Sequence, residues 1–247
     1  MTRKIALVTG GTGGIGTAIC QKLSSHFQVV ANYFKDKDHE RALEWQHQQK
    51  QNGFQIEVLY GDIRLIEDCQ QMVALMLERY GQVDVLINNA GTTADATLKN
   101  MSKQQWDMVI DTNLNSVFNI TSQVISVMLS QKYGRIISIS SINGRKGQFG
   151  QCNYAATKSA LYGFSRSLAQ EVASKGITVN TISPGYIETQ MLTKMKPEIL
   201  QQIISGIPVG RLGKPEEIAE LVYFLSQESS AFITGANFDI NGGQYYG

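Results

Sequence analysis

Short apolar runs rich in Val and Ile alternate along the chain with longer segments in which apolar residues recur at helical spacing. This alternation is typical of repeated strand–helix–strand units around a parallel sheet. We expect seven strands, at 5–8, 28–32, 56–60, 83–87, 135–138, 178–182 and 237–240. The expected helices are 15–25, 39–52, 66–80, 103–131, 153–175 and 215–226. The pattern therefore predicts an α/β fold built on an open parallel sheet.

The same alternation continues to the C-terminal end of the chain. With only four prolines and no Gly/Ser tract or block of charges, no segment has the composition of an interdomain linker. We therefore expect one domain over residues 1–247. Residues 187–213 are the exception, because they follow a strand but mix Met, Lys, Pro and Gly. They predict a mobile lid over a pocket.

Composition limits the class of protein. A chain of 247 residues with 43% hydrophobic and 17% charged residues supports a sizeable core and excludes a disordered tail protein. Its 22 Lys and Arg against 21 Asp and Glu lack the positive excess of a nucleic-acid-binding protein. No apolar run approaches the roughly 20 residues that span a bilayer, so we expect no membrane partner and a cytoplasmic location. Three cysteines and three histidines without metal-ligand spacing predict neither disulfides nor a metal site.

A glycine-rich turn, TGGTGGIG at 9–16, directly follows the first strand and precedes a helix. In that position glycines let the backbone approach a pyrophosphate, which unpaired N–H groups at the helix N-terminus bind. The alternative is a tight connection without a ligand, but five glycines in residues 10–16 cost more conformational entropy than such a turn requires. The expected cofactor-binding residues here are Gly10, Thr12, Gly13, Gly14, Ile15 and Gly16.

Two other strand ends carry polar residues that suit a nucleotide. Asn88-Asn89-Ala90-Gly91 closes the fourth strand, where it either shapes the nucleotide site or merely ends the strand. Asp62 follows the third strand, and its carboxylate either contacts an adenine amino group or caps the next helix. For Asp62, its position and the neighbouring motifs favour the adenine contact.

The end of the second strand bears on the type of dinucleotide. No carboxylate stands at the strand tip, where one would bind the ribose hydroxyls of NAD. Asp36 remains a candidate for that contact, whereas Lys35 and Arg41 suit the 2′-phosphate of NADPH. We favour NADPH as the cofactor, the alternative for the two cations being an ordinary solvated helix face.

Tyr154 and Lys158 share one face of a predicted helix, and Tyr154 follows Ser141 by 13 residues. Ser141 lies at the C-terminal end of the fifth strand, the edge at which an open parallel sheet binds its ligands. There the hydroxyl of Ser141 can bind a substrate carbonyl while the phenol of Tyr154 donates a proton to its oxygen. Such a phenol works best with a lowered pKa, which we expect Lys158 and a nicotinamide charge to supply.

Asn113 lies within the long predicted helix at 103–131. Asn competes for backbone hydrogen bonds and is a mediocre helix-interior residue, so Asp111-Thr112-Asn113 predicts a local kink. The alternative is an Asn that faces solvent.

These motifs occur in order over essentially the whole chain, together with Pro184-Gly185, and the set resembles the short-chain dehydrogenase/reductases. The resemblance implies a single-domain Rossmann fold with a doubly wound parallel sheet flanked by helices. It implies that Asn113 holds a water that links Lys158 to a proton relay, and that Lys158 also binds the nicotinamide ribose. The further cofactor contacts that it implies are Gly61, Asp62, Ile63, Asn89, Ala90, Gly91, Tyr154, Pro184, Gly185, Ile187 and Thr189.

Three stretches narrow the resemblance to family members that reduce short 3-oxoacyl-CoA thioesters: TAICQ at 17–21, GRKGQFGQCNY at 144–154 and SPGY at 183–186. This implies NADPH-dependent reduction of acetoacetyl-CoA to (3R)-3-hydroxybutyryl-CoA, as in polyhydroxybutyrate synthesis. It also implies a homotetramer built on the helices at 103–131 and 153–175. The expected substrate contacts are Asp95, Ser141, Gln148, Phe149, Gln151, Gly185 and Tyr186.

Two alternatives remain open. One is the reductase of 3-oxoacyl thioesters on acyl carrier protein, although those enzymes commonly carry Arg where this chain has Gly13. The other is a nucleotide-sensing binding protein without catalysis, which has no need for Ser141, Tyr154 and Lys158 together.

Overall fold

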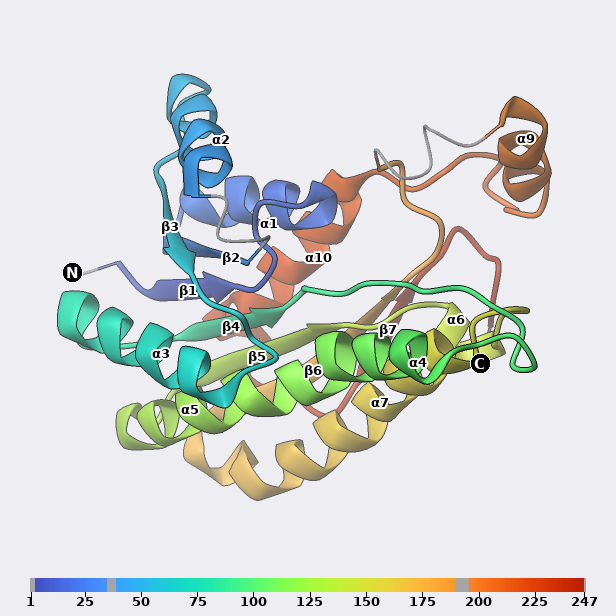
Figure 1. The fold of residues 1–247 in the computed structure, drawn as a ribbon. Coiled ribbons are helices and arrows are strands. Elements are labelled where there is room, and N and C mark those ends of the chain that lie inside the picture. The colour runs from blue at the N-terminus through green and yellow to red at the C-terminus, as the bar shows by residue number, and fades with distance from the viewer. Residues whose placement is uncertain (1–2, 35–38, 190–195, 247) are drawn as a thin grey trace.

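The computed structural model describes residues 3–34, 39–189 and 196–246. Its strands form a sheet of seven parallel strands in the order β3-β2-β1-β4-β5-β6-β7 (Figure 1). The strands are β1 Ile5–Val8, β2 Gln28–Tyr33, β3 Ile56–Tyr60, β4 Val85–Asn88, β5 Gly134–Ile139, β6 Ile177–Pro184 and β7 Asn237–Ile240. Each overlaps a predicted apolar run, which confirms the α/β fold and its doubly wound, Rossmann-like sheet.

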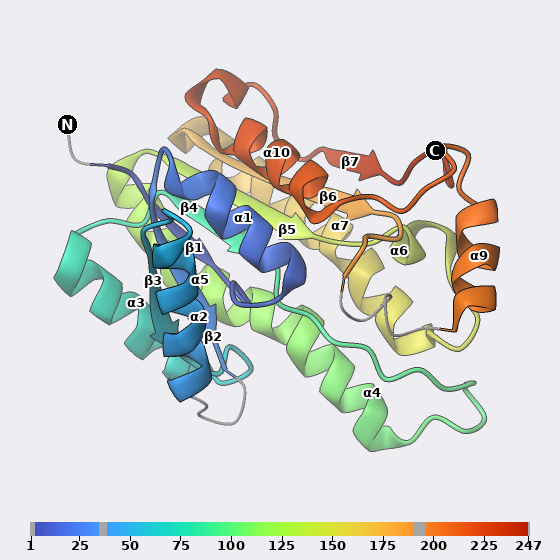
Figure 2. The ribbon, with the colours of Figure 1, turned by 90° about the horizontal axis from the view of Figure 1, so that it is seen from above.

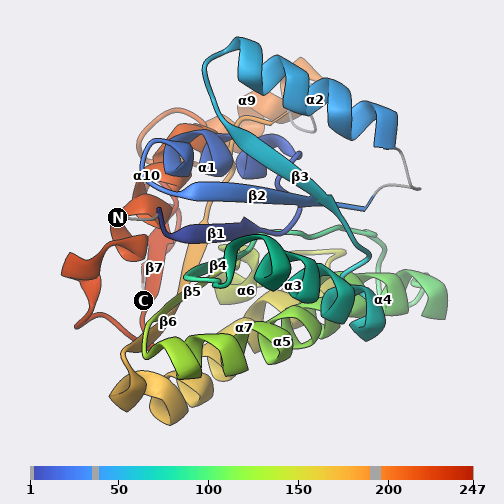
Figure 3. The same ribbon diagram turned by 90° about the vertical axis from the view of Figure 1, so that its left-hand side faces the viewer.

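Helices cover both faces of the sheet (Figure 3). On one face lie α1 Gly14–Ser24, α2 His39–Gln51 and α10 Pro215–Ser226. On the other lie α3 Ile66–Tyr80, α5 Ser116–Gln131 and α7 Cys152–Val172. Successive strand residues point to opposite faces, so Ala6 and Val8 join one apolar core and Leu7 joins the other. Burial on both sides is the reason that β1 is a continuous apolar run and that β4 is apolar except at its last residue.

The long helix predicted at 103–131 is interrupted. α4 Lys103–Ile110 leads into one turn of π-helix at Asp111–Asn115, and α5 follows at Ser116. This confirms the predicted irregularity at Asp111-Thr112-Asn113. The solvent-facing alternative for Asn113 is wrong, because this side chain is 1% exposed. A π-turn inside a helix frequently marks a functional position.

Two helices that the sequence pattern did not predict lie beyond the carboxyl ends of the strands: α6 Asn143–Lys146 and α9 Pro197–Ser205 (Figures 1 and 2). α9 falls within the expected lid at 187–213, of which residues 190–195 lie outside the described part of the chain. Ile187 forms a parallel bridge with Gly213, so the two ends of this segment are held together beside the sheet.

The direction of the crossovers changes at β1, which pairs with β2 on one side and β4 on the other. The loops after β1 and β4 therefore lead away from one another at the carboxyl edge, where doubly wound sheets bind nucleotides. In the described residues, no helix has the length and apolar character needed to cross a bilayer.

Candidate active site

The turn between β1 and α1 has no room for a side chain at Gly16, whose Cβ would collide with the carbonyl oxygen of Gly10. α1 begins at Gly14 with Gly13 as its N-cap, and no side chain caps its first N–H groups. Such N–H groups at a helix N-terminus bind phosphate groups. This cradle fits the pyrophosphate of a dinucleotide. The half-buried members of the turn are Gly10, Thr12 and Ile15.

Hydrogen bonds tie the loop after β4 to this turn. The Nδ2 atom of Asn89 donates to the carbonyl oxygens of Thr9 and Gly10 at 3.0 and 3.1 Å. The Oγ1 atom of Thr9 accepts from the backbone N–H groups of Asn89 and Ala90 at 3.0 and 3.1 Å. The NNAG motif therefore does more than end β4, because it fixes the glycine turn in place.

The ammonium of Lys158 and the amide of Asn113 meet at Gly91. Lys158 is 4% exposed, and its Nζ atom donates to the carbonyl oxygen of Ile139 at 2.8 Å. A Cβ on Gly91 would lie 3.4 Å from both this Nζ and Oδ1 of Asn113. The amide of Asn113 accepts from the N–H of Thr92 at 2.8 Å and donates to its carbonyl at 3.0 Å. The π-turn thus brings an amide from the α4–α5 region to the ammonium on α7.

Tyr154 and Ser141 complete this cluster. The Nζ atom of Lys158 lies 5.7 Å from the centroid of the Tyr154 ring, one helical turn away on α7. The side chain of Ser141 forms a hydrogen bond with the phenol of Tyr154 and accepts from the N–H of Asn143 at 3.1 Å. The hydroxyl of Ser140 donates to the carbonyl of Lys158 at 2.8 Å, which holds the end of β5 against α7. Phenol, hydroxyl and ammonium converge at the carboxyl edge of the sheet.

Burial shifts the pKa of both ionisable groups in this cluster. It lowers the pKa of Lys158 to about 8. It raises the pKa of Tyr154, and the hydrogen bond with Ser141 offsets part of that rise. Without a nicotinamide charge the chain therefore holds the Tyr154 pKa above its ordinary value, because removing a phenolate from water is the largest effect. The expected lowering includes that charge and stays a prediction. At neutral pH the phenol keeps its proton, and this is the form that donates to a developing alkoxide.

Some of the residues expected around the acyl chain lie on two loops that hydrogen bonds join. The Nε2 atom of Gln151 donates to Asp95 at 2.8 Å, and its Oε1 atom accepts from Asn143 at 2.9 Å. Phe149 is 88% exposed, and Gln148 beside it is exposed as well. These loops therefore present polar groups and one exposed aromatic ring next to the cluster of Tyr154, Ser141 and Lys158.

The segment after Pro184, the last residue of β6, borders a cavity of about 140 Å³. Thr189 packs against the glycine turn, since a Cβ on Gly14 would lie 3.3 Å from its methyl carbon. The end of β6 therefore comes close to the pyrophosphate cradle. The expected contact residues that line the cavity are Gly185, Tyr186 and Ile187.

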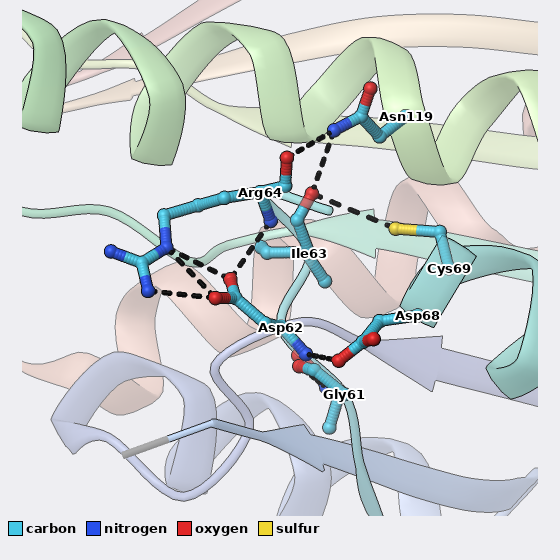
Figure 4. A network of polar contacts seen from close by, with 8 residues as sticks. Gly61, Asp62, Ile63, Arg64, Asp68, Cys69 and Asn119 are labelled. Atoms are coloured by element: carbon cyan, nitrogen blue, oxygen red, sulfur yellow. Dashed lines mark hydrogen bonds and ion pairs between the residues drawn. The ribbon is translucent and has the colours of Figure 1, made fainter. Parts of the chain in front are cut away.

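The loop after β3 holds an ion pair that sequence reasoning missed (Figure 4). Arg64 donates from Nε and Nη2 to both carboxylate oxygens of Asp62, at 2.7 to 3.1 Å. The N-cap of α3 is Leu65, with no side-chain cap, so the alternative in which Asp62 caps this helix is wrong. Asp62 instead accepts the N–H of Arg64 at 3.0 Å in a local turn. Gly61 and Ile63 flank it in the same loop.

Of the two cations expected to bind a 2′-phosphate, the structure describes only Arg41. Lys35 lies outside the described residues, as does Asp36. Arg41 is the third residue of α2, which begins at His39, and it is exposed. Near the end of β2 the structure places Arg64 instead, with its guanidinium carbon 4.4 Å from the ring centroid of Phe34.

Comparison with known proteins agrees with this geometry. The sequence matches the short chain dehydrogenase family over residues 4–199. The chain belongs to the short-chain dehydrogenases. It is 50% identical to an acetoacetyl-CoA reductase of Cupriavidus necator over 248 aligned residues, which cover 100% of both chains. It is 48% identical to nodulation protein G of Azospirillum brasilense, again over 100% of both chains. A 3-oxoacyl-[acyl-carrier-protein] reductase of Escherichia coli is 41% identical over 98% of this chain and 97% of its own.

As a short-chain dehydrogenase the protein is an oxidoreductase that works with a nicotinamide cofactor. The cradle at Gly13–Gly16 fits the pyrophosphate of that group. Among the described residues, no group of three or more His, Cys, Asp and Glu side chains is placed to hold a metal ion.

Proposed function

We propose that this short-chain dehydrogenase reduces acetoacetyl-CoA to (3R)-3-hydroxybutyryl-CoA with NADPH. The observation that carries the proposal is the convergence of Tyr154, Ser141 and Lys158 beside the glycine turn. The relatives that share the whole chain supply the substrate class, since several are named acetoacetyl-CoA reductases at 43 to 50% identity.

Each group in the cluster has a defined task in this reduction. The hydroxyl of Ser141 and the phenol of Tyr154 bind the keto oxygen, and the bound cofactor supplies a hydride to the keto carbon. Tyr154 donates its proton to the oxygen as the negative charge develops there. The ammonium of Lys158 stabilises the phenolate left behind and returns a proton to it. Asn113 holds the relay water next to Lys158.

The loops around the cluster suit a short acyl thioester. Phe149 and Tyr186 provide apolar walls on two sides, while Asp95, Gln148 and Gln151 offer hydrogen bonds to the amides of a pantetheine arm. The lid at 187–213 closes over this site in the proposed cycle. Its ends are joined by the N–H of Glu188, which donates to the carbonyl of Gly213 at 2.8 Å.

A homotetramer in the cytoplasm, acting in polyhydroxybutyrate synthesis, belongs to the same proposal. Large apolar side chains stand exposed on α4 and α5, as expected of helices that pack against another subunit. They are Met108, Phe118 and Leu129, with exposures of 39%, 57% and 39%.

Acyl carrier protein is the second candidate carrier of the acyl group, because the Escherichia coli relative is named a 3-oxoacyl-[acyl-carrier-protein] reductase. The two candidates are separated by steady-state oxidation of NADPH with acetoacetyl-CoA, longer 3-oxoacyl-CoA thioesters and the acetoacetyl thioester of acyl carrier protein. The proposal requires the highest kcat/KM with acetoacetyl-CoA. A higher value with the carrier-protein thioester would replace it with the second candidate.

A further inference from the structure

The 2′ substituent of an adenosine ribose lies at the tip of the second strand in a doubly wound sheet. Here β2 ends at Tyr33, with Phe34 next, so an aromatic pair stands where NAD-binding proteins place a carboxylate. Tyr33 is in register with Tyr60 of β3, so the two strands end side by side. The loop after β3 therefore reaches the place where a 2′-phosphate would bind.

Arg64 of that loop lies at this tip. Its guanidinium carbon stands 4.4 Å from the centroid of the Phe34 ring, which is close enough for a cation–π contact. The side chain is 36% exposed, whereas that of its partner Asp62 is 7% exposed. The positive group is therefore on the solvent side of the pair, where an incoming anion meets it first.

The same guanidinium forms an ion pair with the carboxylate of Asp62. Oδ1 accepts from the backbone N–H and Nε of Arg64 at 3.0 and 2.9 Å, and Oδ2 accepts from Nε and Nη2 at 3.1 and 2.7 Å (Figure 4). These bonds come from three N–H groups, because both oxygens share the single N–H of Nε, so Arg64 occupies three of the about four lone-pair positions of the carboxylate. A bidentate pair of this kind also neutralises the carboxylate charge.

We propose that Arg64 is a specificity-determining residue, which lets the adenosine end accept a 2′-phosphate by neutralising Asp62. This inference rests on the proposed use of NADPH. Without Arg64, the bare carboxylate of Asp62 would repel an approaching 2′-phosphate, and such repulsion reaches over about 8 Å at physiological salt. A ribose without that phosphate carries no charge there, so it meets no such repulsion. Removal of Arg64 therefore weakens the binding of NADPH and spares NADH.

Two fragments of the cofactor test this without turnover. The dissociation constants of 2′,5′-ADP and 5′-ADP are measured by calorimetry on the full chain and on Arg64→Gln. We expect the value for 2′,5′-ADP to rise roughly tenfold and that for 5′-ADP to change less than about twofold. Arg79→Gln is the matched control, because it removes an exposed arginine of α3 that pairs with Glu57. It should leave both constants unchanged.

Two further variants make the result decisive. Asp62→Asn added to Arg64→Gln should recover most of the lost affinity for 2′,5′-ADP, because the carboxylate charge is then absent. Arg64→Lys should keep part of the preference, since it keeps the charge but loses the bidentate fork. Equal weakening of both fragments in Arg64→Gln, or no recovery in the double variant, overturns the inference.

The parent chain separates this inference from the proposed function. If the parent prefers 2′,5′-ADP and Arg64→Gln keeps that preference, Arg64 has no such role and NADPH stands. If the parent binds 5′-ADP more tightly, the proposed use of NADPH fails and the inference fails with it. The ratio of kcat/KM for NADPH to that for NADH should fall in Arg64→Gln by the same factor as the fragment preference.

Discussion

Replacing Lys158 by Met should make the protein more stable while it destroys activity. Moving the pKa of a lysine from 10.5 in the unfolded chain to about 8 in the folded one costs about 3 kcal/mol of stability at pH 7. Methionine has a similar length and no charge, so it removes this cost. It also leaves the Ile139 carbonyl without its 2.8 Å hydrogen bond, which offsets about 1–2 kcal/mol of the gain. The net expectation at pH 7 is a gain of about 1–2 kcal/mol.

The pH dependence gives this prediction its signature. The folded pKa of Lys158 lies below the unfolded one, so the cost of burying the charge is complete below pH 8. It disappears as the pH rises toward 10.5, because the unfolded chain binds the extra proton only up to that point. The stability advantage of Lys158→Met should therefore shrink by about 2 kcal/mol between pH 7 and pH 9.5.

Urea unfolding, followed by the fluorescence of the two tryptophans, measures the free energy of unfolding at both pH values and at one protein concentration. Lys175→Met is the matched control, since Lys175 is exposed at the end of the same helical region. The control should track the parent at both pH values. If the difference between Lys158→Met and the parent stays constant from pH 7 to pH 9.5, the buried ammonium does not carry the cost assigned to it.

Two further substitutions probe the supports of the site. Gly16→Ala should abolish cofactor binding, because the added Cβ collides with the Gly10 carbonyl that shapes the pyrophosphate cradle. Quenching of tryptophan fluorescence measures the binding. A variant that binds NADPH normally would show that the turn needs no glycine at this position. Tyr162→Phe removes the hydroxyl that donates to the carbonyl of Ser141 at 3.1 Å and bonds the hydroxyl of Ser183 at 3.0 Å. It should lower the free energy of unfolding by about 1–3 kcal/mol and reduce kcat more than it raises KM, whereas an unchanged kcat would show that Ser141 needs no such anchor.

The sheet could be predicted because parallel strands buried on both faces leave a strong trace in the sequence. β1 and most of β4 are short, continuous apolar runs, and the glycine turn and the NNAG motif mark their ends. The edge at which Ser141 and Tyr154 meet followed from the same logic, since the carboxyl ends of parallel strands share one edge. α6 at Asn143–Lys146 left no such trace, because four residues are too few to show a helical period.

Other features depend on tertiary contacts that no local pattern encodes. Asn113 indicated an irregular turn in the helix. The burial of its side chain, however, depends on hydrogen bonds with the backbone of Thr92 in another loop. Arg64 was visible two residues after Asp62, yet its place beside Phe34 depends on β2 and β3 ending in register. The rise of the Tyr154 pKa in the chain without cofactor could not be predicted, because burial, its largest cause, is known only once the fold is in place.

The most direct test of the central claim is the turnover of Tyr154→Phe with acetoacetyl-CoA, measured together with the dissociation constant of NADPH. Phenylalanine keeps the ring and removes only the hydroxyl that hydrogen-bonds with Ser141. The account predicts a fall in kcat of at least about 100-fold, with NADPH binding unchanged within about twofold, as for loss of a positioned proton donor. A kcat within tenfold of the parent would show that the proton comes from another group.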